Sequence, residues 1–166
     1  MKVCIVGPSG AGKSTIAVEL ARTFGIATYG FDNIYWDTSG VEFVKNTDES
    51  MAQAIEKIIE QDNWFVEGAY DKRMYRLLVE CSLILRVEVS FGVRAIRLIK
   101  RFIHSTMMGK LPKETFGNTV DLIKFSYRFD KRLSGFLSRD AALLRKVVSV
   151  HDTSSCIKAM RATGLC

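Results

Sequence analysis

The sequence predicts an α/β fold built on a parallel sheet with helices on both of its faces. Five short apolar runs, rich in β-branched residues, alternate with segments of helical spacing along the 166 residues, and this alternation is typical of a doubly wound sheet. The glycine-rich segment 7–14 directly follows the first apolar run and precedes a helix, at the kind of turn where such folds bind ligands. The length is that of one domain, so we expect residues 1–166 to form a single unit.

Each predicted strand is a short apolar run bounded by turn residues. The strands are expected at residues 1–6, 26–31, 64–67, 82–87 and 146–150. Apolar residues three or four positions apart predict helices between and after these strands. The helices are expected at residues 14–24, 48–61, 72–80, 90–104, 119–137 and 153–163. We expect 33–46 to be an irregular, aromatic-lined segment and 105–118, with its glycines and Pro112, to be a loop.

The net charge of +6 is unevenly distributed along the chain. Residues 1–93 carry 9 basic and 13 acidic side chains, whereas residues 94–146 carry 13 basic and 4 acidic ones. A basic third of a chain is typical of contact with a polyanion, although a solvated helical surface has the same composition. No segment resembles a signal peptide or a membrane span, and the 4 cysteines show no metal-binding spacing. We therefore expect a cytoplasmic protein with reduced thiols and no membrane contact.

Residues Gly7–Ser14 read GPSGAGKS and match the phosphate-binding loop G-x-x-x-x-G-K-[ST]. The glycines let successive backbone N–H groups turn toward an anion. Lys13 adds a positive charge for the β- and γ-phosphates, Ser14 offers a hydroxyl to Mg²⁺, and the following helix points its positive end at the phosphates. A glycine-rich turn that binds nothing is the alternative, but the strand before the loop and the helix after it favour a nucleoside triphosphate. The expected contacts are Gly7, Pro8, Ser9, Gly10, Ala11, Gly12, Lys13, Ser14 and Thr15.

Two acidic residues follow predicted strands, so we expect them at the same edge of the sheet as the loop. Asp32 is a candidate catalytic residue that would accept the proton of a substrate hydroxyl or hold that hydroxyl in line. Its alternative role is to cap the turn to Asn33. Glu67 would serve Mg²⁺ together with Ser14, unless it is a surface glutamate.

Two rows of basic residues fall in the predicted helices on either side of the 105–118 loop. Within each row the residues lie three or four positions apart and share a helix face. The rows are Arg94, Arg97 and Arg101, extended by His104, and Lys124, Arg128 and Arg132. Such rows suit a closing lid that places guanidinium groups on a transferred phosphate, and a solvated helix is the alternative. Lys13, Arg97 and Arg101 are thus predicted catalytic residues, and Arg128 is predicted to contact the substrate.

Further side chains near Asp32 are candidates for binding a second substrate. The aromatic residues Tyr35, Trp36 and Phe43 would stack on a ring, or equally form a local core. Arg73 and Arg76 follow the third predicted strand and would contact the acceptor. Residues 31–63 contain no arginine, which favours a hydroxyl acceptor positioned by Asp32, while Arg73 and Arg76 leave a nucleoside monophosphate open.

Several segments together resemble the DNA topology-modulation proteins, which belong with the adenylate-kinase-like P-loop kinases, as do shikimate and nucleoside kinases. These segments are the phosphate-binding loop, Asp32–Trp36, Trp64–Tyr70 and the helix with Arg94–Arg101. At the third strand end this chain has Glu67, Gly68 and Ala69, where the family usually has aspartate, glycine and asparagine. The resemblance implies a three-layer P-loop NTPase fold with strand order 2-3-1-4-5. It also implies ATP and Mg²⁺, and an arginine-bearing lid at about residues 101–132.

These observations predict a kinase that moves the γ-phosphoryl group of ATP to a small acceptor, which is a nucleoside, a nucleotide or another hydroxyl compound. A second hypothesis is an ATP-binding regulatory protein that influences DNA topology through basic residues 94–146. The sequence contains no helix-turn-helix, RNA-binding or N-K-x-D signature. The oligomeric state is left open.

Overall fold

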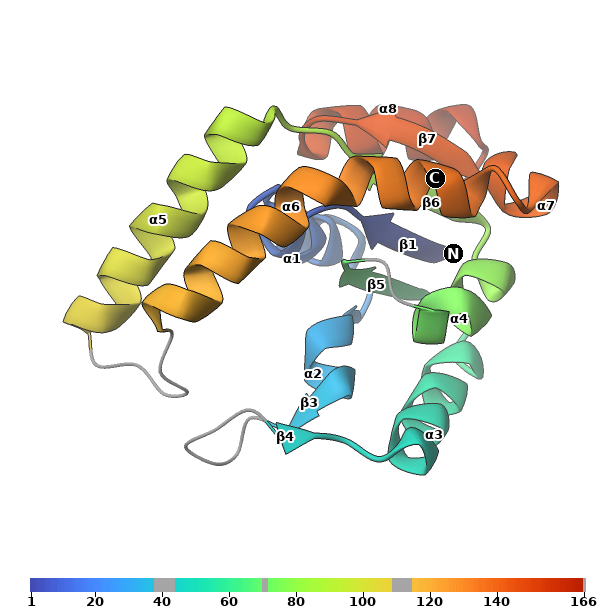
Figure 1. Ribbon diagram of the computed structural model, residues 1–166. Coiled ribbons are helices and arrows are strands. Elements are labelled where there is room, and N and C mark those ends of the chain that lie inside the picture. Colours follow the sequence, from blue (N-terminus) through green and yellow to red (C-terminus); the bar gives the residue numbers. More distant parts are fainter. Residues whose placement is uncertain (38–43, 70–71, 109–114, 166) are drawn as a thin grey trace.

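The predicted strands form one parallel sheet in the computed structural model, which describes residues 1–37, 44–69, 72–108 and 115–165 (Figure 1). The strands are β1 (Lys2–Val6), β2 (Thr28–Gly30), β5 (Trp64–Gly68), β6 (Leu83–Val87) and β7 (Val147–Val150). They lie in the order β2-β5-β1-β6-β7, and all neighbouring pairs are parallel. Numbered within this sheet alone, the order is 2-3-1-4-5, which confirms the expected fold class.

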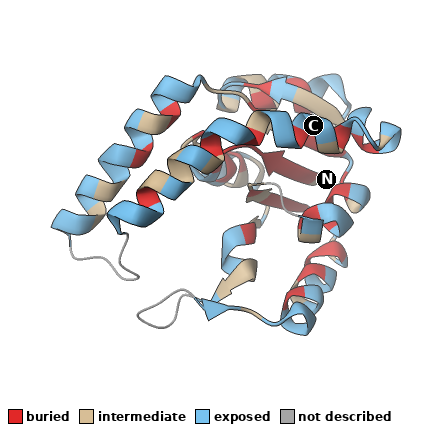
Figure 2. Ribbon diagram, viewed as in Figure 1, coloured by how far each residue is buried: buried red, intermediate tan, exposed pale blue. Residues whose placement is uncertain are grey.

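Helices cover both faces of the sheet and complete the three layers. One face packs against α1 (Lys13–Phe24) and α8 (Thr153–Ala162). The other face packs against α3 (Asp48–Ile59), α4 (Tyr75–Glu80) and α6 (Phe116–Leu137). Successive side chains of β1 enter opposite cores, and Figure 2 shows β1 and β5 buried along their length. Because both faces are covered, these strands are apolar except at Lys2 and Glu67 near their ends, which is why short apolar runs located them.

α5 (Phe91–Met107) runs beside α6, and the two helices extend beyond the sheet (Figure 1). The side of α5 that faces the protein includes Arg94, which is only 3% exposed. Its outer side carries the exposed side chains of Val93, Ile96, Ile99, Ile103 and Met107. α5 therefore buries one charged and one apolar residue, Arg94 and Leu98, and leaves much of its apolar surface exposed.

The helices α5 and α6 are longer than predicted, so the loop between them is shorter than 105–118. α5 continues to Met107, and α6 begins at Phe116. The Thr115 hydroxyl accepts a hydrogen bond from the Asn118 amide, and this cap starts α6 three residues before the expected position. The predicted apolar stripe of α6 is present, with Phe129 and Leu133 fully buried.

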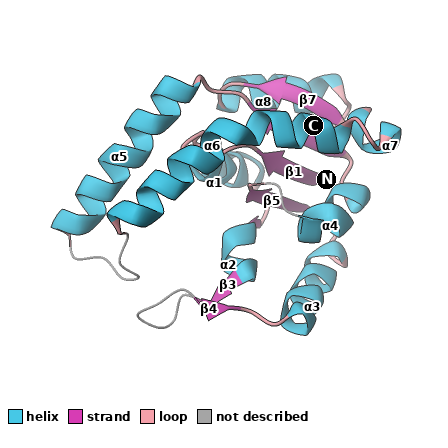
Figure 3. Cartoon of the chain, viewed as in Figure 1, coloured by secondary structure: helices cyan, strands magenta, loops and turns pink. Residues whose placement is uncertain are grey.

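The segment after β2 is more regular than expected (Figure 3). β2 covers only three residues, and the chain then forms α2 (Phe31–Tyr35) and the short antiparallel pair β3 (Trp36–Asp37) and β4 (Val44–Lys45). The prediction of a strand to residue 31 and an irregular segment from 33 was therefore wrong. Burial of Phe31 explains the early helix, because its ring belongs to the core beneath β5. Two further short elements are η1 (Lys72–Met74) and α7 (Ala141–Leu144).

Within the described ranges, no helix is both long and apolar enough to cross a membrane. The thiols of Cys4, Cys81 and Cys156 are free and buried. Burial raises the pKa of the Cys156 thiol to about 12, so this side chain stays protonated at neutral pH.

Candidate active site

The phosphate-binding loop lies between β1 and α1, as the motif predicts. Gly10 and Gly12 have φ angles of 81° and 92°, a conformation that residues with a Cβ rarely adopt. A Cβ at Gly10 would also lie 2.8 Å from the Arg94 carbonyl oxygen. The Ala11 amide donates to the Pro8 carbonyl at 3.2 Å and closes a turn. The loop therefore packs directly against the start of α5.

The Lys13 side chain is almost enclosed, with 9% of its surface exposed. Its Nζ donates to the Pro8 carbonyl oxygen at 3.1 Å. Burial lowers the pKa of Lys13, the negative charges of Glu67 and Asp32 raise it, and the positive charge of Arg101 lowers it. Charges influence one another in this way at short range. The structure thus gathers Asp32, Glu67 and Arg101 around the Lys13 amine.

Ser14 and Glu67 are in direct contact, because β5 lies next to β1 in the sheet. The Ser14 hydroxyl donates to Glu67 Oε1 at 2.8 Å. A hydroxyl and a carboxylate are the hard oxygen ligands that suit Mg²⁺, which usually keeps waters and phosphate oxygens as its other ligands. In the part of the chain that the structure describes, no three His, Cys, Asp or Glu side chains are placed so that they could hold a metal ion by themselves. Ser14 and Glu67 therefore fit a Mg²⁺ ion that is bound largely through phosphates.

Asp32 lies in the first turn of α2 rather than at the end of a strand, because β2 ends at Gly30. A Cβ at Gly68 would lie 2.8 Å from the Phe31 Cβ, so α2 packs against the end of β5. This contact brings Asp32 to the sheet edge that also carries Glu67. Its side chain is exposed and its charge acts on Lys13, a position that suits the predicted proton acceptance or hydroxyl positioning.

The aromatic residues after Asp32 pack on one another. The rings of Tyr35 and Trp36 meet edge to face, with 4.6 Å between centroids. Tyr35 also packs against the core and supports the Arg73 guanidinium, which lies 4.8 Å from the ring centroid. Tyr35 thus has the local-core role that the sequence left open. Phe43 lies outside the described residues.

The first basic row is divided between two positions. Arg94 donates to Asp130 Oδ2 at 2.8 Å and fastens α5 to α6, so the expectation that it faces the phosphates was wrong. Arg97 donates to the carbonyl oxygens of Gly10 and Ala11 at 3.3 Å each. Arg101 acts on the pKa of Lys13. Of the two predicted catalytic arginines, Arg97 therefore contacts the phosphate-binding loop, and Arg101 is near enough to Lys13 for its charge to lower the pKa of that amine.

The second basic row and Arg76 also occupy different positions. Lys124 lies 3.8 Å from Asp121, and both side chains are exposed. Arg128 and Arg132 line a cavity under α6. Arg76 pairs with Glu56 at 3.2 Å and Glu80 at 3.0 Å, which links α4 to α3.

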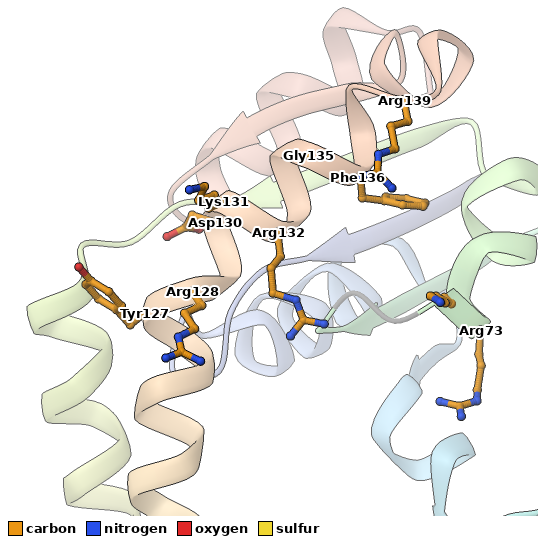
Figure 4. A pocket seen from close by; sticks show the side chains of 10 residues that line it. Arg73, Tyr127, Arg128, Asp130, Lys131, Arg132, Gly135, Phe136 and Arg139 are labelled. Atoms are coloured by element: carbon orange, nitrogen blue, oxygen red, sulfur yellow. The ribbon is translucent and has the colours of Figure 1, made fainter.

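The cavity under α6 is open to solvent and has a volume of about 1380 Å³. In Figure 4, Arg128 and Arg132 extend from α6 toward the side where Arg73 lies. Among the described residues that line it, the one carboxylate is Asp130, which Arg94 holds. We call this feature the basic cavity, after its six cationic residues. They are Lys72, Arg73, Arg128, Lys131, Arg132 and Arg139.

No protein-family model matches the sequence, and neither does any curated protein. A solved structure does match. The shikimate kinase from Bacteroides thetaiotaomicron superposes with a TM-score of 0.57, over 98% of this chain and 98% of that chain, at 14% sequence identity. The fold is that of a shikimate kinase.

The match to the shikimate kinase includes more than the sheet. A coverage of 98% of both chains takes in α5 and α6, so the helices with Arg97, Arg101 and Arg128 belong to the shared fold. At 14% identity the likeness concerns the fold alone. The resemblance to the DNA topology-modulation proteins stays a prediction.

The sequence did not reveal several residues that lie near the site but far from the phosphate-binding loop along the chain. Ser126 is fully buried in α6, and its hydroxyl donates to the Ser9 carbonyl at 3.2 Å. Its signal was a small polar residue on the apolar stripe of a predicted helix. The sequence signal for Asp130 was only that it is one of few acidic residues in a basic segment. Lys72 and Arg139 had no local signal, because only the fold brings η1 and α6 together.

Proposed function

We propose that this chain is a P-loop kinase that transfers the γ-phosphoryl group of ATP to a small acceptor: a nucleoside, a nucleotide or another hydroxyl compound. The hydrogen bond between Ser14 and Glu67, beside the enclosed Lys13, carries this proposal. A phosphate-binding loop alone supports nucleotide binding, whereas a carboxylate and a hydroxyl together at its end support phosphoryl transfer.

Each predicted site residue has a defined part in this proposal. The loop amides and Lys13 would hold the β- and γ-phosphates. Arg97 would keep the loop in place through its two carbonyl contacts. Arg101 would add positive charge beside Lys13, where negative charge develops during transfer. Mg²⁺ bound by Ser14, Glu67 and the phosphates would neutralise part of the phosphate charge.

The transfer replaces one bond to phosphorus with another. The acceptor oxygen forms a bond to the γ-phosphorus while the bond to the β–γ bridging oxygen breaks, and that electron pair leaves on ADP. The proton of the acceptor hydroxyl passes to the Asp32 carboxylate or, if Asp32 only orients the hydroxyl, to water. Residues 101–132 would form the lid that keeps water out.

Substitution of Lys13 tests the proposal. We expect wild-type protein with ATP and Mg²⁺ to release ADP in the presence of at least one member of a panel of nucleosides, nucleotides and small hydroxy acids. Lys13→Ala should lower this rate by about 100-fold or more, because it removes a charge from the transferred phosphate.

The matched control is Lys57→Ala, because Lys57 is an exposed lysine on α3. This variant should turn over as the wild type does, and circular dichroism should show both variants folded. Full turnover by folded Lys13→Ala, or no acceptor-dependent ADP release by the wild type, would contradict the proposal.

A further inference from the structure

The basic cavity carries more positive charge than the described carboxylates near it balance. Six cationic side chains line it, and its carboxylate, Asp130, is already bound by the buried Arg94. Among the described residues, no carboxylate lies within ion-pair distance of Lys72, Arg128, Lys131 or Arg139. Arg128 and Arg132 extend toward the same side (Figure 4), and like charges on one side without a counter-charge repel one another. An anionic ligand would remove this repulsion.

Two of the arginines are held in place by aromatic rings. Arg132 lies 5.5 Å from the centroid of Phe125, and Arg73 lies 4.8 Å from that of Tyr35. Arg73 is also 3.9 Å from Asp48. Guanidinium groups that are already positioned lose less conformational entropy when they bind an anion.

The walls of the cavity are joined at one end by Tyr75. Its hydroxyl donates to Asp140 Oδ2 at 3.1 Å, and its ring meets Phe136 at 6.2 Å between centroids. These contacts link α4, which follows η1, to the end of α6. The separation of the two basic walls is therefore set by packing and not by the ligand.

The cavity lies next to the proposed transfer site. α6 touches the phosphate-binding loop through Ser126, and Arg128 extends from the same part of this helix into the cavity (Figure 4). On the other wall, η1 begins five residues after Glu67, which contacts Ser14. A molecule held between these walls would reach the γ-phosphate side of the loop.

We infer that the basic cavity binds the phosphoryl acceptor, and that this acceptor is a small hydroxyl compound that already carries a phosphate group. The inference rests on the proposed function and narrows its substrate class. A phosphomonoester brings a charge of about −1.5 to −2 at pH 7, more than one carboxylate, and guanidinium groups bind phosphate through paired hydrogen bonds. α6 supplies the arginines that residues 31–63 lack, so their absence from that segment does not argue against a phosphorylated acceptor.

In this arrangement the two ends of the acceptor have different partners. The existing phosphate is held by Arg128, Arg132 and Arg73 and is chemically unchanged. The free hydroxyl points toward Asp32 and the γ-phosphate, and its oxygen forms the new bond to phosphorus as its proton leaves.

Binding measured without turnover tests the inference. Wild-type protein saturated with ADP and Mg²⁺ is titrated calorimetrically with three matched pairs: ribose and ribose 5-phosphate, glycerol and glycerol 3-phosphate, adenosine and adenosine 5′-monophosphate. Malate supplies carboxylates without phosphate. We expect at least one phosphorylated compound to bind at least about 10-fold more tightly than its parent and than malate, a difference of about 1.4 kcal/mol.

The double variant Arg128→Gln/Arg132→Gln should lose this preference by about 10-fold or more. Arg139→Gln is a second, independent variant at the other end of the cavity and should weaken the same binding. The matched control is Lys124→Gln, because Lys124 lies on α6 outside the cavity, and it should bind as the wild type does. Circular dichroism and thermal melting confirm that each variant is folded.

Three results would overturn the inference. The wild type could bind no phosphorylated compound more tightly than its parent, or it could bind malate equally tightly. Alternatively, Lys124→Gln could lose as much affinity for the phosphorylated compound as the double variant. Failure of the proposed function gives a different result. In that case no compound stimulates ADP release. The phosphorylated compound would still bind to Lys13→Ala, and its binding would still be weakened in the arginine variants.

Discussion

Lys13 is held in an environment that favours an anion beside it. Its amine has one hydrogen bond to a carbonyl oxygen, and burial lowers its pKa while Glu67 and Asp32 raise it. A buried ammonium group needs partners for its remaining N–H bonds and its charge. Phosphate oxygens would supply both, so the proposed nucleotide would complete the surroundings of this amine.

Asp32→Asn distinguishes between the roles that remain for Asp32. If the carboxylate acts on the acceptor, the variant should lose about 100-fold in kcat while its ATP dissociation constant stays within about 2-fold of wild type. Steady-state kinetics and calorimetric titration with ATP measure the two quantities separately. Asp62→Asn, at an exposed acid before β5, is the control and should change neither.

An equal loss of turnover and ATP affinity in Asp32→Asn would place this residue on the nucleotide or the metal. Little loss of either would mean that Asp32 takes no part in turnover or in nucleotide binding.

At the scale of elements, α5 is attached through polar and apolar contacts together. Arg94 binds Asp130 of α6, and Arg97 binds two carbonyl oxygens of the phosphate-binding loop. Leu98 is only 1% exposed and lies against the loop at Gly10, and the Phe102 ring meets a ring of α6. The position of α5 is thus tied both to the conformation of the loop and to α6.

α7 is fixed at its start by Asp140, which makes stability pH-dependent. The pKa of Asp140 is lowered, chiefly by the hydrogen bond from the Leu143 amide and also by those from the Tyr75 hydroxyl and the Ala142 amide. A carboxyl group with a lowered pKa in the folded state stabilises the fold above its unfolded pKa of about 3.9, and this contribution is lost as pH falls through the folded value.

Asp140→Ala should therefore melt at a lower temperature than wild type at pH 7, and the difference should shrink as pH falls below about 4. Thermal melting across this pH range measures the effect. The control is Asp121→Ala, at an exposed acid near the start of α6, whose melting temperature should differ less from wild type. A difference that does not depend on pH would show that Asp140 acts without its charge.

The basic residues of α5 and α6 do not form one continuous outer surface. Arg94 is buried, Arg97 contacts the loop, and Arg128 and Arg132 line the basic cavity. The outer side of α5 is mostly apolar. A duplex is bound by cations spread along an exposed face, so this arrangement favours a small anion over DNA.

We accordingly expect weak binding of duplex DNA, with little change between about 50 and 200 mM salt. Fluorescence anisotropy with a labelled duplex measures this, and Arg128→Gln/Arg132→Gln shows whether any binding uses the cavity. A loss of about 1,000-fold over this salt range would indicate six or more phosphate contacts. That result would support the regulatory hypothesis instead.

The fold was predictable from the sequence where local patterns sufficed. Strands buried on both faces have apolar runs, and the phosphate-binding loop has fixed spacing, so the sheet and Lys13 could be placed in advance. The pairing of Ser14 with Glu67 followed from the expected strand order. α2 could not be predicted, because burial of Phe31 under β5 is a tertiary effect. Nor could the cavity, since its two walls are more than fifty residues apart along the chain.

The central place of β1 has a consequence for the synthesis of the protein. β1 pairs only with β5 and β6, so neither edge of this strand has a partner in the sheet before Trp64 has left the ribosome. At about 5–20 residues per second, the stretch of about 60 residues from β1 to β5 takes roughly 3–12 s to make. During this time the strand Lys2–Val6 and the loop after it are available to chaperones, and the proposed phosphate site lacks Glu67. β1 thus leaves the ribosome well before the two strands that flank it in the sheet.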